Sequence, residues 1–179
     1  MACIKKLSRD ITYDCANLGF PGGIGEIDEA IIINSSDIST ISESFLVGTI
    51  TMLTGTKGYV VSSVNNSVMY QEAIKTNDTA PAAEEHSVVI KMLSSMDKTA
   101  YRIAVSNMLG GNFRVALKSK YGDYYLAGAF CGLEASDLAT DSGAGGITTI
   151  TLKTPEAATG DKLVTLTKEA YEGLKIPKA

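Results

Sequence analysis

The chain has 179 residues, 45% of them hydrophobic, and a formal net charge of -4. This length suits one domain with one core, and the acidic balance excludes a surface built mainly to neutralise phosphates. The longest apolar run is far shorter than the roughly 20 residues that cross a bilayer, and no apolar segment follows the lysines near the N-terminus. We therefore expect a soluble protein without a secretion signal, made in a cytoplasm.

Residues 1–28 are predicted to form an N-terminal assembly arm that packs on a neighbouring subunit. They are polar and charged, and the run GFPGGIGEIDE at 19–29 interrupts regular structure with glycine and proline. Residues 29–179 are predicted to form a single β-sandwich domain with a C-terminal extension. Its first short strand is expected at 30–34, where the run AIIIN stands.

The next segments predict three strands joined by turns. Residues 43–54 are expected to form one long strand that is at least partly covered on both faces. A tight turn at 55–58 leads to its partner strand at 59–64, and a third strand follows at 67–76. Proline and polar residues in NDTAPAAEE predict a loop over 77–85.

One strand and one helix are predicted in the middle of the chain. The strand at 85–93 places His86, Val88, Ile90 and Met92 on one face. The helix that follows has Ser94 or Ser95 as its N-cap and Asp97 in its first turn. It ends before Gly110-Gly111, and Ile103 and Ala104 are expected to pack against the sheet.

A hairpin is predicted from the alternation over 113–121 and the turn that follows it. Its charged side, formed by Arg114, Lys118 and Lys120, is expected to face solvent or a neighbour. A flexible stretch at 134–146 then precedes a strand at 147–153. A last strand is expected at 162–167, and the tail after it stays open between a short helix and an extended end.

About eight strands with short connections surround one helix, so the predicted fold is mainly β (α+β). Its architecture is an antiparallel β-sandwich or split barrel with one flanking α-helix.

The candidate catalytic and metal-binding residues are few. Cys3, Cys15 and Cys131 show no CxxC spacing, and their odd number predicts free thiols in a reducing compartment. Nucleophilic catalysis usually needs a histidine base, and the single histidine, His86, is expected to be an ordinary packed or surface residue of its strand. A structural zinc site needs more ligands than these. We therefore expect no enzyme activity, no metal ion and no cofactor.

Two glycine clusters, PGGIGE at 21–26 and GAGG at 143–146, are interpreted as flexible loops. Neither stands between a strand and a helix, where a phosphate loop would be. Calcium binding through Asp141 in the run DSGAGG, which contains the second cluster, stays an alternative to a plain loop tip.

The order of elements resembles that of the tube-forming subunits of tailed bacteriophages, and it is most similar to those of phages infecting Bacteroides-type bacteria. The resemblance rests on NFRVALKSKYGDYYLAGAFCGLEA at 112–135, the Gly/Ser-rich stretch after it, and TTITLKTPEA at 148–157. It covers roughly residues 43–155. The Gly-rich N-terminal arm and the extension from about residue 156 depart from this pattern.

The resemblance implies a virion structural protein that forms hexameric rings of a tail tube or tail connector. The implied partners are further copies of the chain and other tail or connector proteins. DNA is expected to pass through the lumen without specific binding, because like charge repels a polyanion. The resemblance leaves open whether the chain is a tube subunit, a connector ring or a tail terminator. It implies synthesis in the host bacterial cytoplasm, location in the virion tail and no membrane partner.

Two other function classes are compatible with a β-rich chain. A carbohydrate-binding or adhesin-type β-sandwich is the first alternative, although the chain has no tryptophan. A small hydrolase is the second, and the single histidine disfavours it.

Two acidic stretches, 76–85 and 134–146, are predicted to be long loops that contact neighbours or line the lumen, since long unstructured loops are usually functional or disordered. The candidate interface or lumen residues are their carboxylates: Asp78, Glu84, Glu85, Glu134, Asp137 and Asp141.

Overall fold

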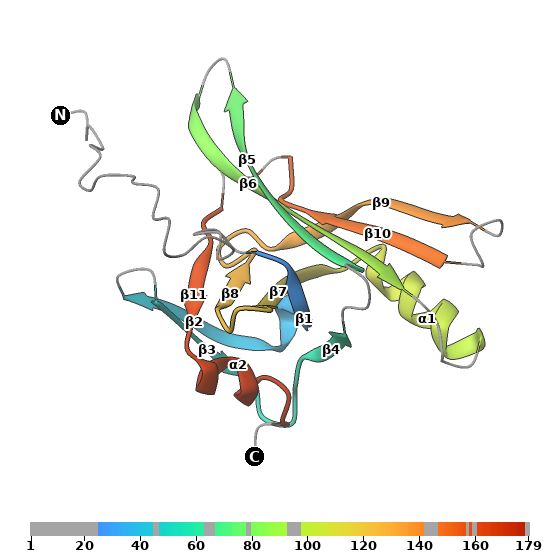
Figure 1. The fold of residues 1–179 in the computed structure, drawn as a ribbon, viewed down its shortest axis with the longest axis horizontal. Coiled ribbons are helices and arrows are strands. Elements are labelled where there is room, and N and C mark those ends of the chain that lie inside the picture. The colour runs from blue at the N-terminus through green and yellow to red at the C-terminus, as the bar shows by residue number, and fades with distance from the viewer. Residues whose placement is uncertain are drawn as a thin grey trace.

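A computed structural model of the chain describes residues 25–44, 47–62, 67–77, 80–92, 98–141, 147–156, 158 and 161–177. The described residues form an 11-stranded sheet in the order β2-β3-β11-β8-β7-β9-β10-β6-β5, with β1 paired to β7 and β4 (Figure 1). The strands are β1 Ile27–Asn34, β2 Ile38–Ser44, β3 Val47–Met52, β4 Tyr59–Ser62, β5 Val68–Asn77, β6 Ala80–Met92, β7 Asn112–Ser119, β8 Tyr124–Ala127, β9 Leu133–Asp141, β10 Ile147–Lys153 and β11 Val164–Leu166. The helices are α1 Lys98–Met108 and α2 Lys168–Gly173, with a 3-10 turn η2 at Ser35–Asp37.

Strand β1 is buried on both faces, and it lies between two hydrophobic clusters. Ala30 and Ile32 pack in the first cluster, whereas Ile31 and Ile33 pack in the second. An uninterrupted apolar run is what a strand covered on both sides requires. The first cluster extends to β6, β7 and β10, and the second is closed by β11 and α2.

The prediction of a mainly β fold with one main helix is confirmed. The pairs within the described sheet are antiparallel with one exception, because β11 runs parallel to β3 through Thr165–Val47 and Leu166–Gly48. The sheet is therefore mixed. The sequence left open whether the tail forms a short helix or an extended end. The structure shows a short helix, α2. Thr167 caps this helix by accepting a hydrogen bond from the Ala170 amide at 3.2 Å.

The predicted long strand at 43–54 is wrong. Two strands occupy this region, β2 and β3, which form an antiparallel hairpin with Ser44 opposite Val47. The alternation of apolar residues continues across the point where the chain reverses, so it does not mark the reversal. The strand after it, β4, pairs with β1 rather than with β3.

The two predicted acidic loops are largely strand. Strand β6 begins at Ala80 and pairs with β5, so 80–85 is not a loop. Pro81 stands where the β5–β6 register shifts, which accommodates its missing N–H group. Strand β9 covers 133–141 and pairs with β10; residues 142–146 of the second predicted loop lie outside the described part.

Helix α1 ends at Met108, before Gly110-Gly111, as predicted. Ser94, Ser95 and Asp97 lie outside the described residues. The predicted burial of Ile103 is wrong, because this side chain is 56% exposed. Ala104 is half-buried. Met108 packs into the first hydrophobic cluster, so the helix is attached to the body at its C-terminal end, at one side of the sheet (Figure 1).

The boundary of the N-terminal arm also differs from the prediction. Residues 1–24 lie outside the described part, but β1 already begins at Ile27, which is buried. The Lys120 amide donates a hydrogen bond to the Glu26 carbonyl at 2.8 Å, and Lys118 pairs with Asp28 at 2.7 Å. Residues 26–28 therefore pack on their own domain. None of the described helices is long and apolar enough to cross a membrane.

Candidate functional site

The β5–β6 hairpin carries a cluster of polar side chains on one of its faces. Its register places Glu72 directly opposite His86, with Ile74 opposite Glu84 and Tyr70 opposite Val88. Since side chains alternate between the two faces of a strand, Tyr70, Glu72, Glu84 and His86 share one face. We call these four residues the hairpin cluster.

His86 is the buried member of the hairpin cluster. Its side chain is fully buried, and neither Nδ1 nor Nε2 has a hydrogen-bond partner among the described residues. The ring meets Tyr70 edge-on, with centroids 5.7 Å apart. Burial lowers the pKa of His86 below its ordinary value, while the charges of Asp161, Glu72 and Glu84 oppose this shift. The net direction favours a neutral imidazole.

The backbone of β6 at this point is held on its other side by the chain after β10. The His86 amide donates to Thr154 Oγ1 at 2.9 Å, and the Thr154 amide donates to the His86 carbonyl at 3.0 Å. The Asp161 amide donates to the Glu84 carbonyl at 3.0 Å. These bonds fix the positions from which His86 and Glu84 project.

Asp161 is a buried carboxylate that organises the loop after β8. Its Oδ1 accepts from the amides of Phe130 at 3.1 Å and Lys162 at 2.7 Å, and its Oδ2 accepts from the Cys131 amide at 3.3 Å. Backbone donors of this kind stabilise a buried carboxylate. Sequence reasoning did not single out Asp161, because two of its three donors, the amides of Phe130 and Cys131, lie about 30 residues away in the chain.

Arg114 does not face solvent freely, contrary to the prediction for the charged side of the hairpin. It is half-buried, and its Nη1 donates to Asn112 Oδ1 at 2.6 Å and to the Ser35 hydroxyl. Asn112 Nδ2 in turn donates to Glu134 Oε1 and to the Cys131 carbonyl, both at 3.3 Å. Burial lowers the pKa of Arg114, and the charge of Asp161 opposes that shift. This network ties η2, β7 and β9 together.

The six carboxylates predicted from the sequence do not form one site. Glu84 joins the hairpin cluster, while its neighbour Glu85 points to the other face of β6 and pairs with Lys153 at 3.0 Å. Glu134, on β9, accepts a hydrogen bond from Asn112 Nδ2 on β7. Asp137 and Asp141 are exposed further along β9, and Asp78 lies outside the described residues.

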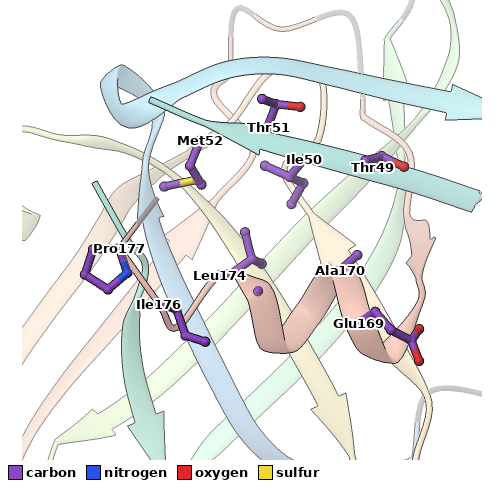
Figure 2. Close-up of a pocket in the computed structure, with 10 residues that line it drawn as sticks. Thr49, Ile50, Thr51, Met52, Glu169, Ala170, Leu174, Ile176 and Pro177 are labelled. Atoms are coloured by element: carbon purple, nitrogen blue, oxygen red, sulfur yellow. The ribbon is translucent and has the colours of Figure 1, made fainter. Parts of the chain in front are cut away.

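A shallow groove of about 390 Å³ lies between β3 and α2 (Figure 2). Ile50 and Met52 project into it from the strand, and Leu174 and Ile176 line it from the end of the helix and the turn after it. Ile176 is 68% exposed. The remaining lining residues are Thr49, Thr51, Glu169, Ala170, Gly173 and Pro177. No aromatic side chain is among them, so nothing in this groove favours the stacking of a sugar ring.

The comparisons with known proteins identify no relative. No protein-family model matches the chain, and no curated protein and no solved structure is significantly similar to it. The function of the chain has therefore to be argued from its own residues.

Proposed function

We propose that the protein is a virion structural subunit that assembles into rings of a phage tail tube or tail connector, through which DNA passes. The proposal extends the sequence resemblance stated above. The observation that carries it is the β5–β6 hairpin, which projects from the body of the molecule (Figure 1). Strand β5 of this hairpin is an edge strand of the sheet, and its Ile74 side chain is 74% exposed.

An exposed apolar edge strand is a pairing surface, and monomeric proteins usually protect such edges. Strand β5 has Met69 on one face, 42% exposed, and Ile74 on the other. Edge strands with apolar side chains on both faces are suited to contact a second protein chain. In a ring, the second protein chain at this edge is another copy of the same protein.

A closed ring needs two different complementary surfaces on each subunit, because its contacts run head to tail. The hairpin edge around Ile74 is one such surface. The groove between β3 and α2, with Ile176 at its rim, is the other, and the two lie at opposite ends of the molecule (Figure 1). We propose that the hairpin of one subunit contacts this groove of the next.

Electron microscopy and analytical ultracentrifugation of the purified protein test the proposal. The expected result is rings or stacked tubes for the wild type. Ile74→Ser and Ile176→Ser are each expected to shift the protein toward monomer without unfolding it, because both side chains are exposed. Ile103→Ser, which changes an exposed isoleucine on α1, is the matched control.

Two outcomes would count against the proposal. A wild-type protein that stays monomeric at all accessible concentrations contradicts ring formation. Rings that persist in both the Ile74 and the Ile176 variants would contradict the proposed contact between the hairpin and the groove. Assembly would then have to use other surfaces.

A further inference from the structure

The hairpin cluster has the donor set of a metal site. One ligand atom each from Glu72, Glu84 and His86, a ring nitrogen and two carboxylate oxygens, lie within 4.8 Å of one another. The three residues come from the two paired strands, with Glu72 opposite His86 and Glu84 two residues before it. The hairpin register therefore brings the three ligands to one point.

The buried imidazole is the second observation, and it is independent of the acidic pair. A fully buried polar side chain normally has a hydrogen-bond partner, because leaving it without one costs free energy. His86 has none at either nitrogen among the described residues. The cluster places one of its nitrogens near both carboxylates, where a bound cation would satisfy it.

The charges that act on His86 come from three carboxylates, those of Asp161, Glu72 and Glu84. Neither Glu72 nor Glu84 forms a salt bridge within the described part of the chain, whereas Glu85 on the opposite face pairs with Lys153. Asp161 adds a third carboxylate whose charge acts on both His86 and Tyr70. A divalent cation at the hairpin cluster would neutralise this charge.

We propose that Glu72, Glu84 and His86 form a binding site for one divalent transition-metal ion, with zinc as the best match to their chemistry. Imidazole nitrogen and carboxylate oxygen are both zinc ligands, and a nitrogen ligand disfavours magnesium and calcium, which take oxygen. Three protein ligands leave a fourth position of a tetrahedral ion for water. The buried Tyr70 hydroxyl lies on the same face beside Glu72, where it is placed to donate to that water.

The three ligand atoms need to move only slightly to bind a zinc ion. Ligand atoms of a tetrahedral zinc site stand about 2.0–2.2 Å from the ion and therefore roughly 3.3–3.6 Å from one another. The exposed carboxylates of Glu72 and Glu84 can close the remaining distance, at most about 1.5 Å, by rotation. His86 stays fixed by packing and by the backbone bonds to Thr154. A bound ion would link β5 to β6 across the hairpin.

Titration of the full chain with zinc chloride, followed by isothermal calorimetry and by thermal denaturation, tests this site. The expected result is one ion per chain and a raised melting temperature, because a ligand that binds only the folded state stabilises it. Cobalt(II) is expected to bind at the same stoichiometry with the visible absorption of a tetrahedral complex. Magnesium chloride at the same concentration is expected to cause neither effect.

Single-residue variants locate the ion. Glu72→Gln and Glu84→Gln, both exposed, are each expected to weaken zinc binding by about tenfold or more. Glu85→Gln is the matched control, because it removes a neighbouring carboxylate that points to the other face, and it is expected to bind zinc like the wild type. These variants avoid His86, whose replacement in the core can unfold the protein.

No zinc binding at about millimolar concentration would overturn the proposal. Equal binding by the Glu72, Glu84 and Glu85 variants would also overturn it and would place the ion elsewhere, for example at the cysteine thiols. Neither result bears on ring assembly, so the two proposals succeed or fail separately.

Discussion

The hydroxyl of Tyr171 donates a hydrogen bond to Glu29 Oε1 at 3.0 Å, across 142 residues of chain. This contact joins α2 to the central strand β1. Lys175 Nζ lies 2.6 Å from the same oxygen and 5.2 Å from the centre of the Tyr171 ring. Because Tyr171 is fully buried, the helix closes the second hydrophobic cluster with a side chain whose one polar atom is satisfied.

Replacing Tyr171 with Phe is expected to cost about 0.5–1.5 kcal/mol of unfolding free energy, the usual contribution of one hydrogen bond. The ring still fills its place, and Glu29 keeps Lys175 as a partner. Tyr171→Ala is expected to cost about 3–5 kcal/mol, because it also empties the core. Urea denaturation measures both values. Equal losses for the two variants would show that the ring does not pack as described.

Stability is expected to fall at alkaline pH through Tyr171. Its pKa lies above the ordinary value of 10.0, first because of burial and then because of the charge of Glu29. The unfolded chain thus loses this proton at a lower pH than the folded chain. The contribution is fully present below about pH 10 and is lost as pH rises above it.

The Tyr171→Phe variant separates this effect from the titration of lysines. Its unfolding free energy, measured between pH 8 and about pH 11, is expected to fall less steeply than that of the wild type. Identical slopes for the two proteins would contradict the assignment to Tyr171.

The two ends of the apolar side of α1 are expected to differ in their contribution to stability. Ile103 is 56% exposed, so Ile103→Ala is expected to change the unfolding free energy by less than about 0.5 kcal/mol. Met108 is buried in the first cluster, so Met108→Ala is expected to cost about 2–5 kcal/mol. Chemical denaturation of both variants measures the two changes in unfolding free energy. A larger loss at Ile103 than at Met108 would restore the helix orientation predicted from the sequence.

Gly58 is expected to tolerate no side chain. Its amide donates to the Leu174 carbonyl at 2.8 Å, and an added Cβ would overlap the side chain of Ile31 and approach that carbonyl oxygen to 3.3 Å. Gly58→Ala is therefore expected to destabilise the protein by about 1–3 kcal/mol. Gly110→Ala, where nothing lies within 4 Å of the added Cβ, is the control. Thermal melting that ranks the two variants in the opposite order would contradict the close packing of Gly58.

In the proposed ring, the β9 carboxylates are the candidates for an acidic lumen. Asp137 and Asp141 are exposed and four residues apart, so they project from the same face of the strand. Asp137→Lys together with Asp141→Lys is expected to leave ring formation intact and to slow DNA ejection, because lysine attracts phosphate. Ejection from particles that carry the variant measures this effect.

A control with the same change of charge is Asp123→Lys with Glu156→Lys, two exposed positions in the β7–β8 turn and after β10. Normal ejection from the Asp137/Asp141 variant would place β9 away from the lumen. Slow ejection from both variants would show that net charge, rather than position, determines the rate.

The sequence predicts well those elements whose burial differs between two faces. The strand at 147–153 has the predicted bounds, and His86, Val88 and Ile90 share a buried face as expected. The β7–β8 hairpin and the end of α1 before Gly110 were also predicted correctly. In each case the period of apolar residues, or a glycine that stops a helix, is a local consequence of how the element meets the core.

The sequence does not predict elements whose strand character depends on a partner. Strand β9 is mostly exposed, so its residues carry no alternation to recognise. The division into β2 and β3 and the pairing of β4 with β1 depend on backbone hydrogen bonds between strands, within a tight hairpin for β2 and β3 and between separated segments for β1 and β4. These bonds involve backbone groups that every residue except proline has in full, and side-chain patterns therefore say little about them.

The hairpin cluster also combines features that the sequence predicts with features that only the strand pairing determines. The sequence alone determined that the chain has one histidine, that it lies on the apolar face of a strand, and that acidic residues precede it. Only the tertiary structure decided that Glu72 stands opposite His86, that Glu84 and Glu85 point apart, and that no described residue satisfies the imidazole. The physical reason is register: a shift of one residue between β5 and β6 would turn these side chains to opposite faces.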